Sequence, residues 1–577
     1  MSKLFQEFPA VSKQQWEDVI VKDLKGADYE KKLVWKTDEG FNVQPYYVEE
    51  DITNLKYLRD FAGKNLQTQA NDWEIRQDFT TGDIAHLAAE AVKKGAQSVG
   101  LSVAGIKSAN DFEKLLNGID PLTTGIHLIE AGDTAAIMAF FAEYLNDKKI
   151  DSAKVYGSIC AAFNCKCNTN SPDELIEKFG AKFPNFRLIE IRGFALRNKG
   201  CTITQELGFT IAHAACILRK LTEKGMTADQ IIPRMTLHFA TGSNYFMEIA
   251  KIRAARVLFN AVATAFGASK KDVFIHSSSS TWNKAIYDPY VNMLRSTTET
   301  MSAAIGGADS ISTADFDETY IAASDFSTRI ARNQQILLKE ESFINKVADP
   351  AAGSYYIEHL CDSLAEAAWK IFLDVEEKGG YCNVREEYVL PEIEKSAAAR
   401  LKDVSSRKKF VLGVNQYPNL NESMLSQIKI EDEYLRASSE IEKLRLQTER
   451  AGRKPKVFLL TFGNLAMRKA RAGFATNFFG CSGYEIIDNP GFKTGAEGAN
   501  AALAAKADIT VLCSSDDEYA ALVAEALPVL KGKTAVVLAG YPTEQIEEFK
   551  AQGVEEFIHV RSNVLDVLTA FNGKLLK

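Results

Sequence analysis

Eight short β-rich runs alternate with long amphipathic segments in the first part of the chain. The runs cover residues 73–79, 98–103, 126–131, 154–160, 186–193, 234–240, 272–278 and 309–315. Segments with a helical period separate them, the longest at 245–267. Because strand, helix and strand at this spacing make a right-handed crossover, the pattern predicts parallel strand pairing. Eight such units favour a (β/α)8 TIM barrel, with a doubly wound eight-stranded sheet as the main alternative.

A second α/β pattern begins at Val457. Its five β-rich runs cover residues 457–463, 484–489, 508–514, 534–540 and 555–560. Helical segments lie between these runs and after the last. This pattern indicates a small doubly wound, flavodoxin-like domain, which binds ligands at the carboxyl ends of its strands.

These patterns divide the chain of 577 residues into four predicted parts. Residues 1–70 form an irregular N-terminal segment with some helix. Residues 71–407 form the barrel and a helical extension, since 326–407 is helical in character throughout. Residues 408–456 are a turn-rich and then charged linker, and residues 457–577 are the flavodoxin-like domain.

Charge and hydropathy narrow the functional classes. The chain has 68 Lys and Arg residues against 76 Asp and Glu, a formal net charge of −8, and no long run of like charges. We therefore expect neither a nucleic-acid partner nor attachment to a membrane surface. The most apolar stretch, residues 135–142, is too short to span a bilayer, and the N-terminus lacks the apolar core of a signal peptide. These features predict a cytoplasmic protein.

The nine cysteines are odd in number and irregularly spaced. In a long chain without a secretion signal, this distribution predicts reduced thiols. Cys165 and Cys167 form a CxC pair, but no His or Cys pair lies nearby at zinc-finger spacing. We expect no metal site.

Two acidic clusters need an interpretation. Asp516, Asp517 and Glu518 begin a predicted helix, where acids are favoured by the helix dipole, so capping is the expected role. The second cluster follows the last barrel strand, where a pair of catalytic carboxylates is an alternative to a structural role. It consists of Asp315, Asp317 and Glu318.

Four long segments carry a resemblance to a known family. They are LVWKTDEGFNVQPYY (33–47), PRMTLHFATGSNYFMEIAKIRAARVLF (233–259), DPYVNMLRSTTETMSAAIGGADSISTADFDE (288–318) and DFSTRIARNQQILLKEESFINKVADPAAGSYYIE (325–358). In this order they resemble the methylmalonyl-CoA mutase family. The resemblance implies a coenzyme-A substrate barrel followed by a cobalamin-binding flavodoxin-like domain. Catalytic members interconvert methylmalonyl-CoA and succinyl-CoA with adenosylcobalamin, whose radical chemistry the protein shields.

The cobalamin-binding pattern of the family has changed in this chain. Catalytic members have Asp-x-His-x-x-Gly after the first strand of the last domain, where the His binds cobalt and the Asp orients it. The matching residues here are Leu465, Met467 and Ala470. The family's Ser-x-Leu and Gly-Gly, after the third and fourth strands, are represented by Ser514 with Asp516 and by Ala539 with Gly540. The resemblance therefore predicts a degenerate cobalamin-binding domain.

The barrel positions that the resemblance marks as catalytic have changed as well. A Tyr after Ile-Arg-Gln is replaced by Asp78, and a Gln after the fourth strand by Cys160. A His that bonds the thioester carbonyl is replaced by Ala195. Each position lies at the carboxyl end of a barrel strand, where barrel enzymes keep their chemistry, and losing one such hydrogen bond costs on the order of 10²–10³ in rate.

The resemblance thus implies a chain that is inactive alone and holds neither a metal nor a cofactor. Such a chain would pair with a homologous catalytic large subunit that carries adenosylcobalamin, stabilising and closing it as a heterodimer. Two alternatives remain open at this point. One is an active mutase with unusual cobalt ligation, and the other is an acyl-CoA or small-ligand sensor on the same fold.

Overall fold

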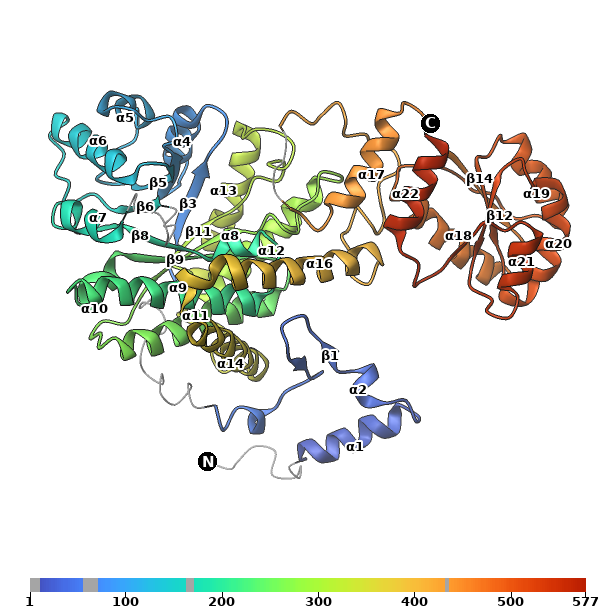
Figure 1. Ribbon diagram of the computed structural model, residues 1–577, viewed down its shortest axis with the longest axis horizontal. Helices are drawn as coiled ribbons and strands as arrows, with labels where there is room; N and C mark the ends of the chain where they lie inside the picture. Colours follow the sequence, from blue (N-terminus) through green and yellow to red (C-terminus); the bar gives the residue numbers. More distant parts are fainter. Residues whose placement is uncertain (1–10, 56–70, 162–170, 431–434, 577) are drawn as a thin grey trace.

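The N-terminal segment lies on the outside of the molecule. The computed structural model describes residues 11–55, 71–161, 171–430 and 435–576, so the CxC pair considered above lies outside the described residues. Helices α1 (Lys13–Asp23) and α2 (Tyr29–Lys32) precede a hairpin of β1 (Trp35–Lys36) and β2 (Asn42–Val43). No residue of α1 is buried, and the helix lies at one side of the molecule (Figure 1). The hairpin turn is anchored by Glu39, whose carboxylate accepts a 2.9 Å hydrogen bond from the Thr204 backbone N–H.

The central sheet closes into a barrel. Its strands are all parallel, in the order β7-β6-β5-β4-β3-β11-β10-β9-β8. The two edge strands, β7 and β8, are consecutive pieces of one predicted run interrupted only by Leu188, so the same stretch of chain pairs with both sides. This is the predicted (β/α)8 barrel, and the doubly wound alternative is wrong. The strands are β3 (Glu74–Phe79), β4 (Ser98–Ser102), β5 (Gly125–Ala131), β6 (Gly157–Ala161), β7 (Phe186–Arg187), β8 (Ile189–Arg192), β9 (Met235–Thr241), β10 (Phe274–Ser279) and β11 (Ser310–Ser312).

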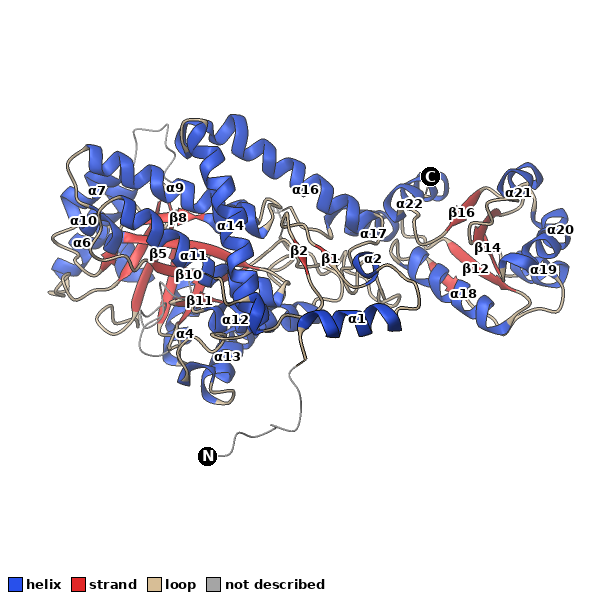
Figure 2. Cartoon of the chain, turned by 90° about the horizontal axis from the view of Figure 1, so that it is seen from below, coloured by secondary structure: helices blue, strands red, loops and turns tan. Residues whose placement is uncertain are grey.

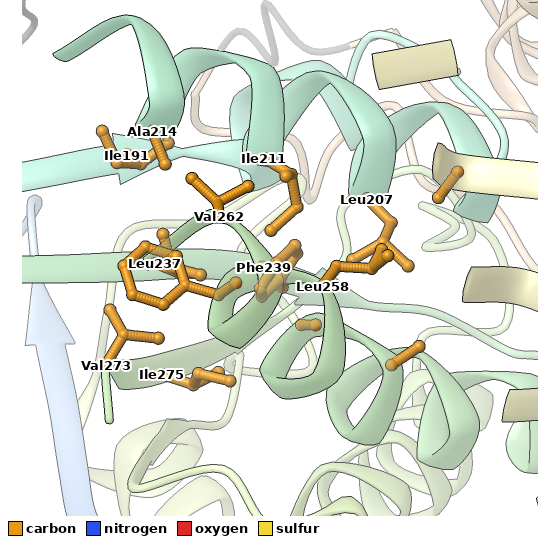
Figure 3. Packing of buried hydrophobic residues seen from close by; sticks show 14 of the residues in the cluster. Ile191, Leu207, Ile211, Ala214, Leu237, Phe239, Leu258, Val262, Val273 and Ile275 are labelled. Carbon is orange, nitrogen blue, oxygen red and sulfur yellow. The ribbon is translucent and has the colours of Figure 1, made fainter. Parts of the chain in front are cut away.

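Helices surround the barrel because the outward face of each strand is apolar. Leu237 and Phe239 of β9 pack against Leu258 and Val262 of the following long helix (Figure 3). Burying side chains of this size contributes roughly 1.5–3 kcal/mol each. None of the described helices has the length and apolar character needed to cross a membrane. The helices are α4 (Ile84–Lys93), α5 (Ala109–Leu115), α6 (Thr134–Asp147), α7 (Pro172–Phe179), α8 (Gly193–Arg197), α9 (Ile203–Glu223), α10 (Ala228–Ile231), α11 (Tyr245–Ala265), α12 (Tyr290–Gly306) and α13 (Asp325–Glu340).

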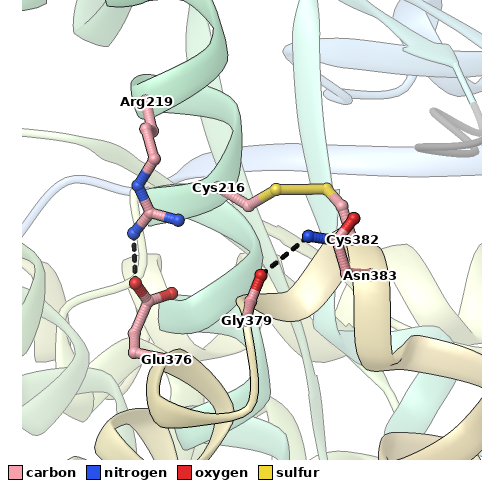
Figure 4. The surroundings of a disulfide bond; sticks show 6 residues. All are labelled: Cys216, Arg219, Glu376, Gly379, Cys382 and Asn383. Atoms are coloured by element: carbon pink, nitrogen blue, oxygen red, sulfur yellow. Dashed lines mark hydrogen bonds and ion pairs between the residues drawn. A yellow bond between two sulfur atoms is a disulfide. The ribbon is translucent and has the colours of Figure 1, made fainter.

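A helical extension packs against α9. It consists of α14 (Tyr355–Glu377), α15 (Tyr381–Val384), a π-helical turn and α16 (Leu390–Ser405). Cys216 of α9 and Cys382 of α15 form a disulfide, beside an ion pair between Arg219 and Glu376 (Figure 4). The prediction that all cysteines are reduced is therefore wrong for this pair. Packing of α15 against α9 brings the two Cα atoms to 6.5 Å, within the range for a disulfide. Because the two cysteines are 166 residues apart in the sequence, no local pattern predicts that they pair.

The C-terminal part is a flavodoxin-like sheet at the far end of the molecule (Figures 1 and 2). Helix α17 (Ser439–Arg450) precedes it and is tied to the barrel by Glu442, which accepts a 2.7 Å hydrogen bond from the Ile286 N–H. The parallel strand order β13-β12-β14-β15-β16 is that of the predicted fold. The elements are β12 (Lys456–Thr461), α18 (Leu465–Gly480), β13 (Glu485–Ile487), α19 (Gly495–Ala504), β14 (Ile509–Cys513), α20 (Tyr519–Leu530), β15 (Ala535–Ala539), α21 (Ile546–Gln552), β16 (Glu556–Ile558) and α22 (Val564–Leu575).

Candidate functional site

The lumen of the barrel is polar because side chains alternate along each strand. Glu190 on β8 and His238 on β9 point inward, whereas Ile191, Leu237 and other apolar side chains between them face the helices. Buried polar groups are tolerated when they are hydrogen-bonded. In the lumen, the histidines are hydrogen-bonded in separate groups of residues. In each group, which we call a set, a histidine lies between a serine and an acidic side chain.

The first set joins β3, β5 and β6. His127 Nδ1 lies 2.8 Å from Ser158 Oγ, and its Nε2 lies 3.3 Å from Glu74 Oε1. Burial, with a further contribution from Arg76, lowers the pKa of His127 to about 4 in spite of the nearby carboxylate. Burial by itself would raise the pKa of Glu74, but the hydrogen bond from His127 and other favourable contacts hold it at about 2.

The second set joins β8, β9 and β10. His238 Nδ1 lies 2.8 Å from Glu190 Oε1, and His238 Nε2 lies 2.9 Å from Ser278 Oγ. The ring stacks on Phe194 with centroids 3.9 Å apart. Burial lowers the pKa of His238, although the hydrogen bond to Glu190 opposes this shift. The imidazole is therefore neutral at pH 7, and donates from Nδ1 to the carboxylate.

Charged groups fill the space around a third histidine. Arg76 Nε donates a 2.6 Å hydrogen bond to Asp78 Oδ1. His276 Nδ1 lies 2.6 Å from Ser310 Oγ, and its Nε2 lies 3.9 Å from Asp78 Oδ2. Burial and the charge of Arg76 lower the pKa of His276 well below its usual range.

Two cavities lie at opposite ends of this polar lumen. The upper one, about 260 Å³, is at the carboxyl ends of the strands and is lined by Asp78, Glu190, His238 and Ser278 among others. The lower one, about 390 Å³, is lined by residues that begin or precede strands, including Glu74. The two cavities share no lining residue. The upper cavity lies where barrel enzymes place their active sites.

The structure brings only some of the sequence-predicted barrel residues together. Asp78, Asp315 and Glu318 line the upper cavity, whereas Asp317 does not. Burial, with the neighbouring charges of Glu318 and Asp317, raises the pKa of Asp315 well above its usual range. Ala195 lies in α8 and does not line the cavity, although its neighbour Phe194 does. The backbone of Cys160 lies on β6, and its side chain is outside the described residues.

The loop after β12 and the start of α18 hold no metal-binding nitrogen. Leu465 is the first residue of α18 and is 56% exposed, while Met467 is 38% exposed and Ala470 is exposed as well. His559 is the sole histidine between residues 457 and 577, and it follows β16, which β14 and β15 separate from β12. The residues present at the first strand therefore do not fit a cobalt-bound imidazole.

A carboxylate from the chain itself lies at the switch point of this sheet. In the observed strand order, the ligand crevice lies between the carboxyl ends of β12 and β14. Glu518 bridges the two following loops, accepting hydrogen bonds from the Asn464 N–H at 3.0 Å, Ser514 Oγ at 2.8 Å and Ser515 Oγ at 2.7 Å. These hydrogen bonds, that from Asn464 first, lower the pKa of Glu518 to about 2. Gly463 allows this approach, because a Cβ there would lie 2.1 Å from Glu518 Oε2.

The three acids of the 516–518 cluster form a 3-10 turn directly before α20, at the helix start where they were expected, but Glu518 makes no capping hydrogen bond. The side chain of Glu518 does not cap α20, because its hydrogen bonds go to the two neighbouring loops. Asp516 Oδ1 pairs with Arg471 of α18 at 3.0 Å. Ala539 is buried at the end of β15, where its carbonyl accepts a 2.6 Å hydrogen bond from the Tyr519 hydroxyl.

The sequence interpretation also missed the sets centred on His127 and His238. The alternation along β8, β9 and β10 is a signal for inward-facing polar residues. It does not show which of them meet, because Glu190, His238 and Ser278 are separated by 40 and more residues.

Comparisons with known proteins agree with the resemblance in the sequence. A family model described as methylmalonyl-CoA mutase matches residues 85–470. The methylmalonyl-CoA mutase small subunit of Porphyromonas gingivalis is 42% identical over 99% of this chain and 98% of its own length. A methylmalonyl-CoA mutase of Rhizobium meliloti is 30% identical over 74% of this chain and 66% of its own. The methylmalonyl-CoA mutase large subunit of Streptomyces virginiae is 28% identical over 77% of this chain and 67% of its own.

Proposed function

Because the chain belongs to the methylmalonyl-CoA mutase family, we propose that it is the non-catalytic small subunit of a heterodimeric adenosylcobalamin-dependent mutase. In this proposal a homologous large subunit binds the cobalamin and isomerises methylmalonyl-CoA and succinyl-CoA. The present chain stabilises and closes that subunit. The radical reaction needs a closed, dry cavity, and a partner surface helps to provide one.

The observation that carries this proposal concerns the ligand crevice at the carboxyl ends of β12 and β14, which lacks the family's cobalt-binding pattern and is bridged by a carboxylate. The family pattern for cobalt binding is replaced by Leu465, Met467 and Ala470. The crevice itself is bridged by the Glu518 carboxylate. An anionic group in that position opposes entry of the phosphate-bearing tail of a cobalamin, since like charges repel at short range.

Large apolar side chains left exposed support a protein partner. Trp16 and Val19 of α1 are 57% and 58% exposed, and no residue of that helix is buried. Tyr290 and Leu294, one turn apart on α12, are also exposed. A short helix without a buried face is marginally stable in water, so a covering surface would stabilise it.

We expect the isolated chain to take up no cobalamin. After incubation with adenosylcobalamin and gel filtration, the protein peak should show no visible corrin absorbance, because no imidazole stands at the first strand. The homologous large subunit, treated in the same way, is the positive control. A coloured peak near one equivalent would contradict the proposal and favour an active mutase with unusual cobalt ligation.

We expect the chain and its homologous large subunit to form one heterodimer. Size-exclusion chromatography with light scattering should show a single 1:1 species when the two are mixed. Mutase activity should be absent from this chain alone, and the large subunit should be more active and more stable in the complex. A large subunit that is fully active and stable by itself would rule out the supporting role.

A further inference from the structure

The set of Glu190, His238 and Ser278 has the geometry of a hydrolytic relay. The carboxylate, 2.8 Å from Nδ1, fixes the imidazole in the tautomer that leaves Nε2 as an acceptor. The serine hydroxyl, 2.9 Å from Nε2, can then donate its proton to that nitrogen. Nucleophile, base and orienting acid within hydrogen-bond reach define this constellation on any fold, whatever the order of the residues in the chain.

Access distinguishes this set from the other histidine sets of the lumen. Glu190, His238 and Ser278 all line the upper cavity, and Ser278 is half-buried. The set of Glu74, His127 and Ser158 has similar distances, but neither His127 nor Ser158 lines the upper or the lower cavity. A substrate in the upper cavity can therefore reach the first serine and not the second.

The same cavity offers hydrogen-bond donors for a developing negative charge. Asn198 lines it, and its Oδ1 accepts hydrogen bonds from Ser280 Oγ and the Thr281 N–H, both at 3.1 Å. Fixing the amide through its oxygen fixes the direction of its Nδ2 hydrogens too. Arg192 also lines the cavity. A fixed amide or guanidinium is the kind of group that stabilises the oxyanion of acyl transfer.

We propose that Ser278, His238 and Glu190 form a second, hydrolytic site in this chain, acting on short-chain acyl esters or thioesters. The cavity volume of about 260 Å³ limits the acyl group of the substrate to a short chain. This activity goes beyond the proposed role in the mutase, and neither depends on the other.

The reaction balances with water as the co-reactant. Ser278 Oγ attacks the acyl carbonyl carbon while His238 Nε2 takes the hydroxyl proton. The bond from the carbonyl carbon to the leaving oxygen or sulfur breaks, and His238 returns the proton to the leaving alcohol or thiol. Water then attacks the acyl-Ser278 ester with His238 as the base, which releases the carboxylic acid and restores the serine. Glu190 is a positioning residue throughout.

The test uses the full chain and p-nitrophenyl acetate. Wild-type protein should release p-nitrophenolate, and S278A should be slower by about 10²-fold or more, because the nucleophile is lost. S158A is the matched control, since it removes the serine that bonds His127 and lines neither cavity. This variant should retain the wild-type rate. Mass spectrometry after treatment with a fluorophosphonate should place the label on Ser278.

The pH profile distinguishes a relay from a merely structural network. The charged and titratable groups facing His238 are Glu190 from β8, His276 from β10, and Arg76 and Asp78 from β3. Burial lowers the pKa of His238, so the acidic limb of the wild-type rate profile should have its midpoint below the usual histidine pKa of about 6.5. E190Q should reduce kcat and shift this acidic limb. Equal rates for wild type and S278A, or labelling elsewhere without labelling of Ser278, would overturn the proposal.

Discussion

Replacing Lys251 with methionine should lower the free energy of unfolding by about 3–5 kcal/mol, because it leaves two carboxylates buried without their main partner. Lys251 of α11 is completely buried, and its Nζ lies 2.7 Å from Glu206 Oε2 and 2.6 Å from Glu248 Oε2. It also donates to the Ala240 carbonyl at 2.7 Å. In the variant, Arg197 would still face both acids, at 3.9 and 3.3 Å.

Urea unfolding followed by tryptophan fluorescence measures this loss. K443M is the matched control, because Lys443 pairs with Glu440 at 2.6 Å on the exposed side of α17. An exposed pair of this kind contributes roughly 0.3–0.5 kcal/mol, so K443M should unfold almost as wild type does. The double variant K251M/E206Q should recover part of the loss, since it removes one of the two acids that are left to share Arg197. Similar midpoints for K251M and K443M would show that the buried cluster does not carry this stability.

The contrast between these two lysines shows what the sequence could and could not predict. The β-rich runs of the barrel were visible because a barrel strand alternates polar inward and apolar outward residues. The central strands of the second sheet were visible for another reason, since strands buried on both faces are nearly continuous apolar runs. Helical periodicity describes both lysines as polar positions on amphipathic helices. Burial of Lys251 depends on Glu206, 45 residues earlier on α9, and no local pattern contains that pairing. Closure of the barrel across Leu188 is likewise a property of the whole sheet.

The candidate sites also show this contrast between local sequence patterns, which could be predicted, and long-range contacts, which could not. Residue types at the carboxyl ends of strands could be compared with a family pattern, which is how Asp78 and Met467 were identified. The hydrogen bonds that determine the chemistry at these positions join residues that are far apart in the sequence. Glu518 bonds Asn464, 54 residues away, and His238 bonds Ser278, 40 residues away. The sequence could therefore indicate which catalytic and cobalt-binding residues of the family have been replaced. It could not predict the hydrogen bonds that the structure has at those sites.

Acid should destabilise the barrel through its lumen histidines, beginning at pH values above the usual pKa of a carboxyl group. The folded pKa of His127 is about 4, against about 6.5 in an unfolded chain. Between these values the unfolded state binds the proton and the folded state does not. The stability contributed by keeping His127 neutral is therefore complete above pH 6.5 and is lost as pH falls toward 4. For this one group the loss is about 3 kcal/mol, and the lowered pKa values of His238 and His276 act in the same direction.

The variant H127Q isolates this contribution, because other groups titrate over the same range. Asp315 has a raised pKa, so its protonation stabilises the folded state as pH falls and partly offsets the histidines. The difference between wild type and H127Q removes such common effects. Urea midpoints between pH 7 and pH 4.5 should fall less steeply for H127Q, by the equivalent of about one proton. H86Q is the control, because His86 is exposed and its side chain is open to solvent on α4. Equal pH slopes for wild type and H127Q would mean that His127 binds its proton over the same pH range in the folded and unfolded states, so that burial does not lower its pKa.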